Sequence, residues 1–391
     1  MGSEHLYVVG VPDDVLIDAD TIRSPELRHE IPAGVMDPFL YGEREGVPFA
    51  AVSPLDAATI AAARPDLRQL DTFDLGLRDL IDSGLTRDEA LLEVRLLACR
   101  EMGVTRAAVP PTFPLATAEH LRAGGVQVIV DRERFAARRR NKTAAELRGI
   151  WRATKAAEAG LKAIAQALHE AETRAGTLYS GDEALTCERL RDLVRAAVES
   201  SGAALGDFIV SRGPQTATGH GPGSGPIAEG EVVIVDLWPQ DRESACFSDI
   251  ARTFVAGTPD PEIEAWHALV VEARDRAIAS VRPGVSGRDL WSQACDLFES
   301  EGFPTQRKPG NAVMEGFPTA LGHGVGLEVH EGPGLGRSGT ELRAGDVITI
   351  EPFLCRPDLG GVQVEDILLV TADGAEVISS LPTGLAPGEF E

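Results

Sequence analysis

Apolar and polar positions follow two rhythms along the first 140 residues. The runs VPFAAVSP, VTRAAVPP and VQVIVD are short, apolar and bounded by turn residues, which is typical of buried strands. Between them lie helical patterns, the clearest of which covers residues 87–102 and places Leu91, Val94 and Leu96 within it. We therefore predict a small α/β domain over residues 1–140.

A long amphipathic stretch begins near Asn141 and marks the start of a second domain, residues 141–391. Its apolar residues recur at helical spacing, with Leu147 and Ile150 the first of them. Thr143 is followed three residues later by Glu146, the spacing of a capping box at a helix N-terminus.

The order of elements then repeats. A helix, the turn RAG, a second helix, a Gly-rich loop and two strands are followed by a second such series, which begins at about Glu262. The second series has the turn RPG and a helix over residues 290–299. The repeated order favours an internal duplication. Chance repetition of common elements is the alternative, because the two halves share little residue identity.

Each half carries a pair of carboxylates in its apolar strands. EVVIVDLW contains Asp236 and ACFSDIARTFV contains Asp249, while DVITIEPF contains Glu351 and GVQVEDILLV contains Glu365. Acidic residues are poor strand formers and are rarely buried unpaired. A salt bridge or a cap would explain any one of them alone. Four such residues in a duplicated frame indicate a bound cation.

Histidines accompany the carboxylates in two Gly-rich loops. ALGHGVGLEVHEGPGLG contains His323, the natural imidazole ligand, and His330, which we expect on a strand close by. TATGHGPGSGPI contains His220, and a purely structural role is the alternative for His220 and His330. Gln363 shares a strand face with Glu365 and is placed to hydrogen-bond a ligand or substrate. Four carboxylates and one imidazole suit a pair of divalent ions that activate water, which indicates a hydrolase.

Charge and cysteine usage narrow the range of partners. A net charge of −24 would repel nucleic-acid phosphates and anionic head groups, so we expect no nucleic-acid or membrane partner. No apolar run approaches the length that spans a bilayer. The five cysteines are far apart and form no CxxC motif, so we expect free thiols and a cytoplasmic location.

The segments VVIVDLW, SDIARTF, GHGVGLEVHEGP, ITIEPF and VQVEDI resemble the pita-bread metallopeptidase family. That family includes methionine aminopeptidase, aminopeptidase P, prolidase and the metal-free creatinase. The resemblance spans roughly residues 141–380 and implies an α+β fold. It implies a pita-bread (creatinase/aminopeptidase-like) catalytic domain with a pseudo-two-fold duplication, preceded by a smaller creatinase-like α/β domain. Methionine aminopeptidase usually lacks that first domain, which favours similarity to aminopeptidase P and prolidase.

The resemblance also implies the chemistry. Two divalent ions, manganese with cobalt or zinc as alternatives, would be ligated by Asp236, Asp249, His323, Glu351 and Glu365. Asp249 and Glu365 would bridge them, and a metal-bridging hydroxide would attack the scissile carbonyl with Glu351 as proton acceptor. His220 and His330 would hydrogen-bond the substrate and the tetrahedral intermediate. The expected substrate is a short peptide cleaved at a bond involving proline at or near its N-terminus. The expected enzyme is an Xaa-Pro aminopeptidase or dipeptidase, and a homodimer.

Two positions depart from the family pattern. Trp238 stands where glycine is common, and we expect its indole to line the pocket. Gln363 stands where prolidases and aminopeptidases P commonly carry arginine and methionine aminopeptidases carry glutamine. Two alternatives therefore stay open: hydrolysis of a non-peptide amide or amidine, and peptide binding without turnover. The five intact ligands argue against the second.

Overall fold

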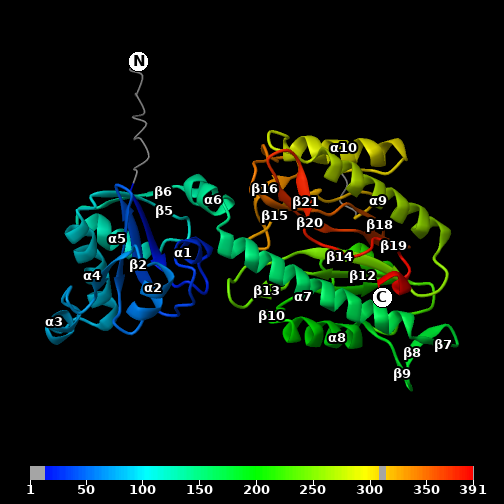
Figure 1. Ribbon diagram of the computed structural model, residues 1–391, viewed down its shortest axis with the longest axis horizontal. Coiled ribbons are helices and arrows are strands. Elements are labelled where there is room, and N and C mark those ends of the chain that lie inside the picture. The colour runs from blue at the N-terminus through cyan, green and yellow to red at the C-terminus, as the bar shows by residue number, and fades with distance from the viewer. Residues whose placement is uncertain (1–13, 308–313, 391) are drawn as a thin grey trace, which may run out of the picture. The chain divides into compact units, whose positions relative to one another are not determined.

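The computed structural model describes residues 14–307 and 314–390 (Figure 1). The chain divides into two compact units, Met1–Arg139 and Arg140–Glu391. None of the helices within the described ranges is long and apolar enough to cross a membrane.

The first unit is built on one six-stranded sheet with the order β4-β3-β2-β1-β5-β6. Only β2 runs antiparallel to its neighbours, and the remaining pairs are parallel. The strands are β1 (Val15–Ala19), β2 (Phe39–Arg44), β3 (Val47–Val52), β4 (Arg68–Asp71), β5 (Arg106–Val109) and β6 (Gln127–Val130). The helices are α1 (Pro25–Glu30), α2 (Ala57–Ala63), α3 (Leu77–Asp82), α4 (Arg87–Met102), α5 (Leu115–Ala123) and α6 (Arg132–Arg140). The three predicted strands and the helix over residues 87–102 are confirmed.

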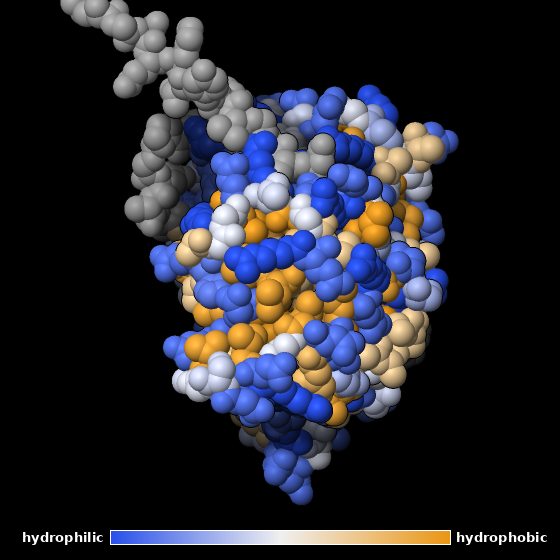
Figure 2. Space-filling view, turned by 90° about the vertical axis from the view of Figure 1, so that its left-hand side faces the viewer, coloured by the Kyte–Doolittle hydropathy of each residue, from blue (hydrophilic) through white to orange (hydrophobic). Residues whose placement is uncertain are grey.

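Most of the large apolar side chains that are exposed in the described residues belong to this unit. Eight of the nine large apolar side chains exposed in the described part of the chain lie here, and the ninth is Leu193. Figure 2 shows a face on which apolar side chains gather between charged ones. A cavity of about 940 Å³ opens at the carboxyl ends of β1, β3 and β4, lined among others by Asp20, Ser53 and Thr72.

The second unit begins with two helices and a three-stranded antiparallel sheet. Thr143 and Glu146 form the predicted capping box at the start of α7. The helices are α7 (Ala144–His169) and α8 (Cys187–Ser200), and the sheet has the order β11 (Ile209–Arg212), β12 (Val232–Leu237), β14 (Ile250–Val255). Shorter elements are β7 (Glu172–Arg174), β8 (Thr177–Ser180), β9 (Glu183–Ala184), β10 (Ala203–Ala204), η1 (Gly213–Thr218) and β13 (Gln240–Asp241).

The same series follows in the second half of this unit. The helices are α9 (Pro261–Ser280) and α10 (Gly287–Ser300). The sheet has the order β16 (Glu331–Leu335), β15 (Gly322–Gly324), β17 (Val347–Ile350), β20 (Asp366–Val370), β21 (Ala375–Val377). A hairpin of β18 (Phe353–Arg356) and β19 (Gly360–Gln363), and the turn η2 (Pro387–Phe390), complete the unit. The antiparallel order β15-β17-β20 repeats β11-β12-β14, as a duplication predicts.

Two apolar cores hold these layers together. One packs α7 and α8 against the strands of the first sheet, and the other packs α9 and α10 against the strands of the second. Figure 1 shows the two helix pairs on opposite sides of the strands. The strands therefore lie in the middle of the unit, where the acidic side chains they carry are shielded from water.

Candidate metal centre

The first carboxylate pair lies at the loop end of the β12–β14 hairpin. Asp236 is the penultimate residue of β12 and pairs in register with Ala251 of β14. Asp249 comes directly before β14, at the end of the connecting loop, and not within the strand as the sequence suggested. Both carboxylates therefore leave the sheet at neighbouring positions.

The second pair occupies matching positions in the other half. Glu351 directly follows β17 and Glu365 directly precedes β20, whose Asp366 pairs with Ile350. A continuous strand through Val364 and Glu365 was predicted, and this prediction was wrong: β19 ends at Gln363 and β20 begins at Asp366.

The cause of this strand break is a set of hydrogen bonds to the first half. The Glu365 N–H donates to the Ala251 carbonyl at 3.0 Å. The Gln363 N–H donates to Thr253 Oγ1 at 2.9 Å, and that hydroxyl donates to the Gln363 carbonyl at 2.8 Å. Residues 363 and 365 thus bond to β14 of the first half. These bonds bring the two carboxylate pairs close together.

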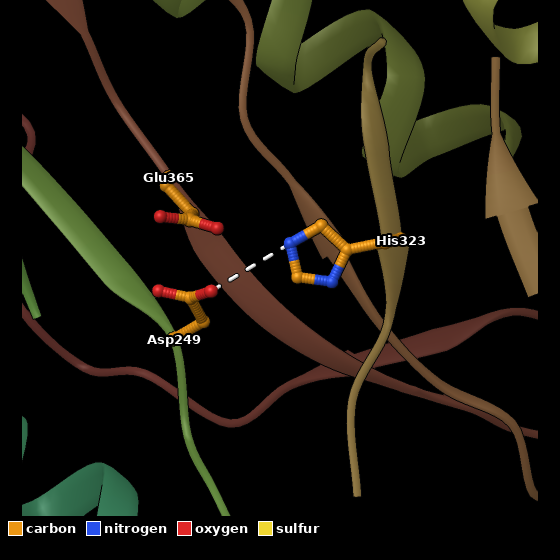
Figure 3. Close-up of side chains that lie close together, drawn as sticks. All are labelled: Asp249, His323 and Glu365. Atoms are coloured by element: carbon orange, nitrogen blue, oxygen red, sulfur yellow. Dashed lines mark ion pairs between the residues drawn. The ribbon is translucent and has the colours of Figure 1, made fainter. Parts of the chain in front are cut away.

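His323 joins the carboxylates from β15. Its Nε2 lies 3.6 Å from Asp249 Oδ2 and 3.5 Å from Glu351 Oε1. One potential ligand atom each from Asp249, His323 and Glu365 lies within 4.8 Å of the others. Figure 3 shows these three side chains pointing toward one another from three separate segments. Asp236 lies close enough to Asp249 for the two carboxyl groups to influence each other's pKa, so all five predicted ligands come together.

The electrostatics of the cluster are unfavourable without a cation. Burial raises the pKa of Asp236 to about 7 and that of Glu351 to about 8. Burial and neighbouring carboxylates also raise the pKa values of Asp249 and Glu365 well above their ordinary range. Burial lowers the pKa of His323 to about 4, so its imidazole is neutral at pH 7, the form that ligates metals.

Several oxygens of the cluster have no hydrogen-bond partner among the described residues. They are both carboxylate oxygens of Glu365 and one each of Asp236 and Asp249, all of them buried. Buried unsatisfied carboxylate oxygens are rare and costly, and metal coordination is one of the few ways to satisfy them. The donor set, oxygen-rich with one neutral imidazole, fits divalent cations.

The two remaining predicted histidines lie on the exposed side of the cluster. The ring centroids of His330 and His323 are 4.3 Å apart, in an edge-to-face arrangement. His220 lies close enough to His330 to lower its pKa, in addition to the larger effect of burial. His330 was expected on a strand, and this was wrong, because residues 326–330 form bends and β16 begins only at Glu331.

Gln363 and Trp238 flank the carboxylates. Gln363 Nε2 donates to Glu351 Oε2 at 3.4 Å, so its contact is with a predicted ligand and proton acceptor. Trp238 is partly buried and packs against the core that contains α7 and α8. Its expected place in the pocket wall stays a prediction.

Sequence reasoning missed a buried ion-pair network beneath the cluster. Arg252 is fully buried, donates to Asp366 Oδ1 at 2.7 Å, and also donates to the carbonyls of Ala251 and Glu365. Arg274 pairs with the same Asp366 carboxylate. The sequence did contain a signal for this network. Arg252 and Asp366 are charged residues within the same apolar stretches that carry Asp249 and Glu365.

Residues 148–372 match metallopeptidase family M24. The chain belongs to this family. A Bacillus subtilis protein, YkvY, is 30% identical over 301 residues, which are 76% of this chain and 76% of its own length. The Xaa-Pro dipeptidase of Pyrococcus horikoshii is 37% identical over 172 residues, and the match covers 44% of this chain and 46% of that protein. The chain thus spans about half the length of this M24 relative.

The fold comparison extends over nearly the whole chain. A prolidase structure from Pyrococcus furiosus superposes with a TM-score of 0.72 at 23% identity, covering 95% of this chain and 97% of that one. This likeness confirms the predicted pita-bread fold of the M24 family. M24 membership also implies divalent metal ions, which the donor set described above fits.

Proposed function

We propose that this M24 protein hydrolyses peptide bonds involving proline at or near the N-terminus of short peptides, as an Xaa-Pro aminopeptidase or Xaa-Pro dipeptidase. The observation that carries the proposal is the buried cluster of four carboxylates and one neutral imidazole, with oxygens that lack hydrogen-bond partners in the described residues. The Xaa-Pro dipeptidase relative supports the choice of substrate class.

The site is proposed to hold two divalent ions, with manganese as the first candidate and cobalt or zinc as alternatives. Asp236, Asp249, His323, Glu351 and Glu365 would be the ligands, with Asp249 and Glu365 shared between the ions. When bound, the ions would supply an activated water and charge stabilisation of the scissile carbonyl. Asp249 lies 3.6 Å from His323 Nε2 and close enough to Asp236 to affect its pKa, and this central position supports its role as a shared ligand.

Protein groups supply the remaining functions. Glu351 accepts the proton of the attacking water, and the Gln363 amide holds its carboxylate through the hydrogen bond at 3.4 Å. His330 and His220 lie on the exposed side, where an arriving peptide meets them, and donate hydrogen bonds to the substrate and the tetrahedral intermediate. Such donors act most strongly on charge that develops in the transition state.

We also infer a cytoplasmic homodimer. The five cysteines are all buried and free, as expected in a reducing compartment. The exposed apolar side chains of the first unit support self-association, because large apolar patches on a protein surface mark contact sites. A domain boundary near residue 140 is part of the same proposal.

Hydrolysis assays on chelator-stripped protein test the proposal. Xaa-Pro dipeptides and Xaa-Pro-Xaa tripeptides are supplied with and without added manganese. Metal-dependent cleavage supports the peptidase, and the preferred peptide distinguishes dipeptidase from aminopeptidase activity. Two bound metals without cleavage would shift the assignment to a non-peptide amide, for which Gln363 in place of the usual arginine is the favouring observation. Failure to bind metal would overturn the whole site.

A further inference from the structure

Lys142 and Glu331 form an ion pair in the interior of the second unit. Their side chains are only 3% and 4% exposed, and Lys142 Nζ donates to a carboxylate oxygen of Glu331. Removing two charges from water carries a desolvation penalty that their attraction often only balances. A buried pair of this kind is therefore a weak source of stability, and its role is better sought in the geometry that it fixes.

On one side, the pair holds the segment that carries the two site histidines. Glu331 directly follows His330, and it pairs in register with Gly324, which directly follows His323. The rings of the two histidines are 4.3 Å apart. The Glu331 carboxylate thus anchors the backbone at the point where both histidine segments meet.

On the other side, Lys142 is attached to a rigid support. It directly precedes Thr143, the N-cap of α7, whose capping box with Glu146 defines where that helix begins. The helix is 26 residues long and contributes Ile150, Leu161 and other residues to the core. The ammonium group is therefore held in place by a long, well-packed helix.

The loop between the histidines lies directly on this pair. A Cβ atom at Gly326 would be 2.7 Å from Glu331 Oε1 and 2.8 Å from Lys142 Cε, so only glycine fits without displacement. The Gly326 carbonyl accepts a hydrogen bond of 2.8 Å from the Phe247 N–H, two residues before Asp249. The ion pair, the histidine loop and the segment that leads through Asp249 into β14 are therefore connected by direct contacts.

We propose that Lys142 and Glu331 are positioning residues, which hold His330 in its place beside His323 during turnover. This inference rests on the proposed function, in which His330 donates a hydrogen bond to the substrate. Loss of the ion pair should therefore lower the rate of the reaction and leave metal binding intact, because neither side chain belongs to the ligand cluster.

A double-mutant cycle tests whether Lys142 acts through His330. Lys142→Met and His330→Asn are made singly and together in the manganese-loaded full chain, and kcat and KM are measured on an Xaa-Pro-Xaa tripeptide. We expect Lys142→Met to lower kcat on the order of 10- to 100-fold when His330 is present, since small misplacements have effects of that size. In the His330→Asn background it should lower kcat by less than about twofold. Losses that multiply would overturn the proposal.

Arg140→Met is the matched control. Arg140 is two residues from Lys142 and pairs with buried Asp346 at 2.6 Å, on the same segment but away from the histidine loop. The Arg140→Met variant should have a kcat within about twofold of the parent value, as expected for an independent site. An equal loss of kcat in both variants would mean general loosening of the segment and would overturn the specific role of Lys142. The double variant Lys142→Met/Glu331→Leu removes both charges, so it should fold even if a single variant does not. It should still show the loss of kcat.

Two further measurements separate this inference from the proposed function. Metal content should stay at the parent level in all of these variants. Amide hydrogen exchange over residues 325–331 should rise about tenfold in Lys142→Met and stay unchanged in Arg140→Met, because exchange reports local opening. Raised exchange in a protein that cleaves no peptide would overturn the proposed function and retain the anchor. Unchanged exchange in folded Lys142→Met protein would overturn the anchor itself.

Discussion

Replacement of Glu365 by glutamine should stabilise the metal-free protein and destabilise the metal-loaded protein. Glu365 is 1% exposed, and neither of its carboxylate oxygens has a hydrogen-bond partner in the described ranges. Its ligand atom lies within 4.8 Å of that of Asp249. Without a cation, two ionised carboxylates at this separation repel each other. With a cation, both become ligands, and removal of one weakens binding.

The size of the effect follows from the distance. At an effective dielectric constant of about 20, two like charges no more than 4.8 Å apart repel by at least roughly 3 kcal/mol. Proton uptake relieves part of this repulsion, so we expect the metal-free Glu365→Gln protein to gain about 2 kcal/mol of unfolding free energy at pH 8. Carboxyl groups with raised pKa values bind more protons in the folded state than in the unfolded state. The stability of the metal-free parent therefore falls as pH rises.

The pH window opens at the ordinary pKa of Glu365, 4.5, because burial and neighbouring carboxylates raise the pKa of its folded carboxyl well above that value. As the pH rises above about 5 the unfolded parent releases this proton and the folded parent keeps it, so the parent loses stability and the advantage of Glu365→Gln grows. Below pH 5 the two proteins should be nearly equal, because the carboxyl groups are protonated in the folded parent.

Urea unfolding followed by tryptophan fluorescence measures this effect. All four tryptophans, Trp151, Trp238, Trp266 and Trp291, lie in the second unit, so the signal reports the unit that holds the site. Glu376→Gln, an exposed substitution on β21, serves as the control and should change stability by less than about 0.5 kcal/mol. The reasoning is refuted if chelator-treated Glu365→Gln protein is no more stable than the parent at pH 8.

Three further outcomes are expected. Asp249→Ala should abolish both turnover and most metal binding, because Asp249 is proposed as a shared ligand; full turnover, measured with metal content, would contradict a two-metal site. His330→Ala should lower kcat by about 100-fold, the typical effect of one lost transition-state hydrogen-bond donor, with metal content near the parent value; loss of metal would instead make His330 a ligand. Arg252→Met should lower the free energy of unfolding by about 3 kcal/mol in urea titrations, because it leaves the buried Asp366 short of a partner; an unchanged midpoint would show that Arg274 alone suffices.

The sequence predicted the candidate site better than the local backbone around it. Asp236, Asp249, Glu351 and Glu365 were recognisable because a charged residue within an apolar stretch of sequence is rare enough to stand out. The break at Glu365 was not recognisable, because it depends on a hydrogen bond to Ala251 in the other half of the unit.

The same reason explains the other differences. The bends at residues 326–330 follow from Gly326 packing on the Lys142–Glu331 pair, whose members are 189 positions apart. Local sequence patterns indicate whether a residue prefers a strand. They do not indicate which distant backbone group or charged side chain will bond to that residue and interrupt the strand. Long-range pairs of this kind have to be observed in the structure.

The positions of the proposed ligands along the chain determine when, during protein synthesis, the metal site can form. Asp236 and Asp249 come from the first half of the second unit, while Glu365 comes from the last strands and bonds back to Ala251. A nascent chain in which residue 365 has not yet left the ribosome contains only part of the ligand cluster. Metal binding is therefore expected late, after both halves of the second unit have been synthesised. A bound ion would then identify molecules in which the two halves have already packed together.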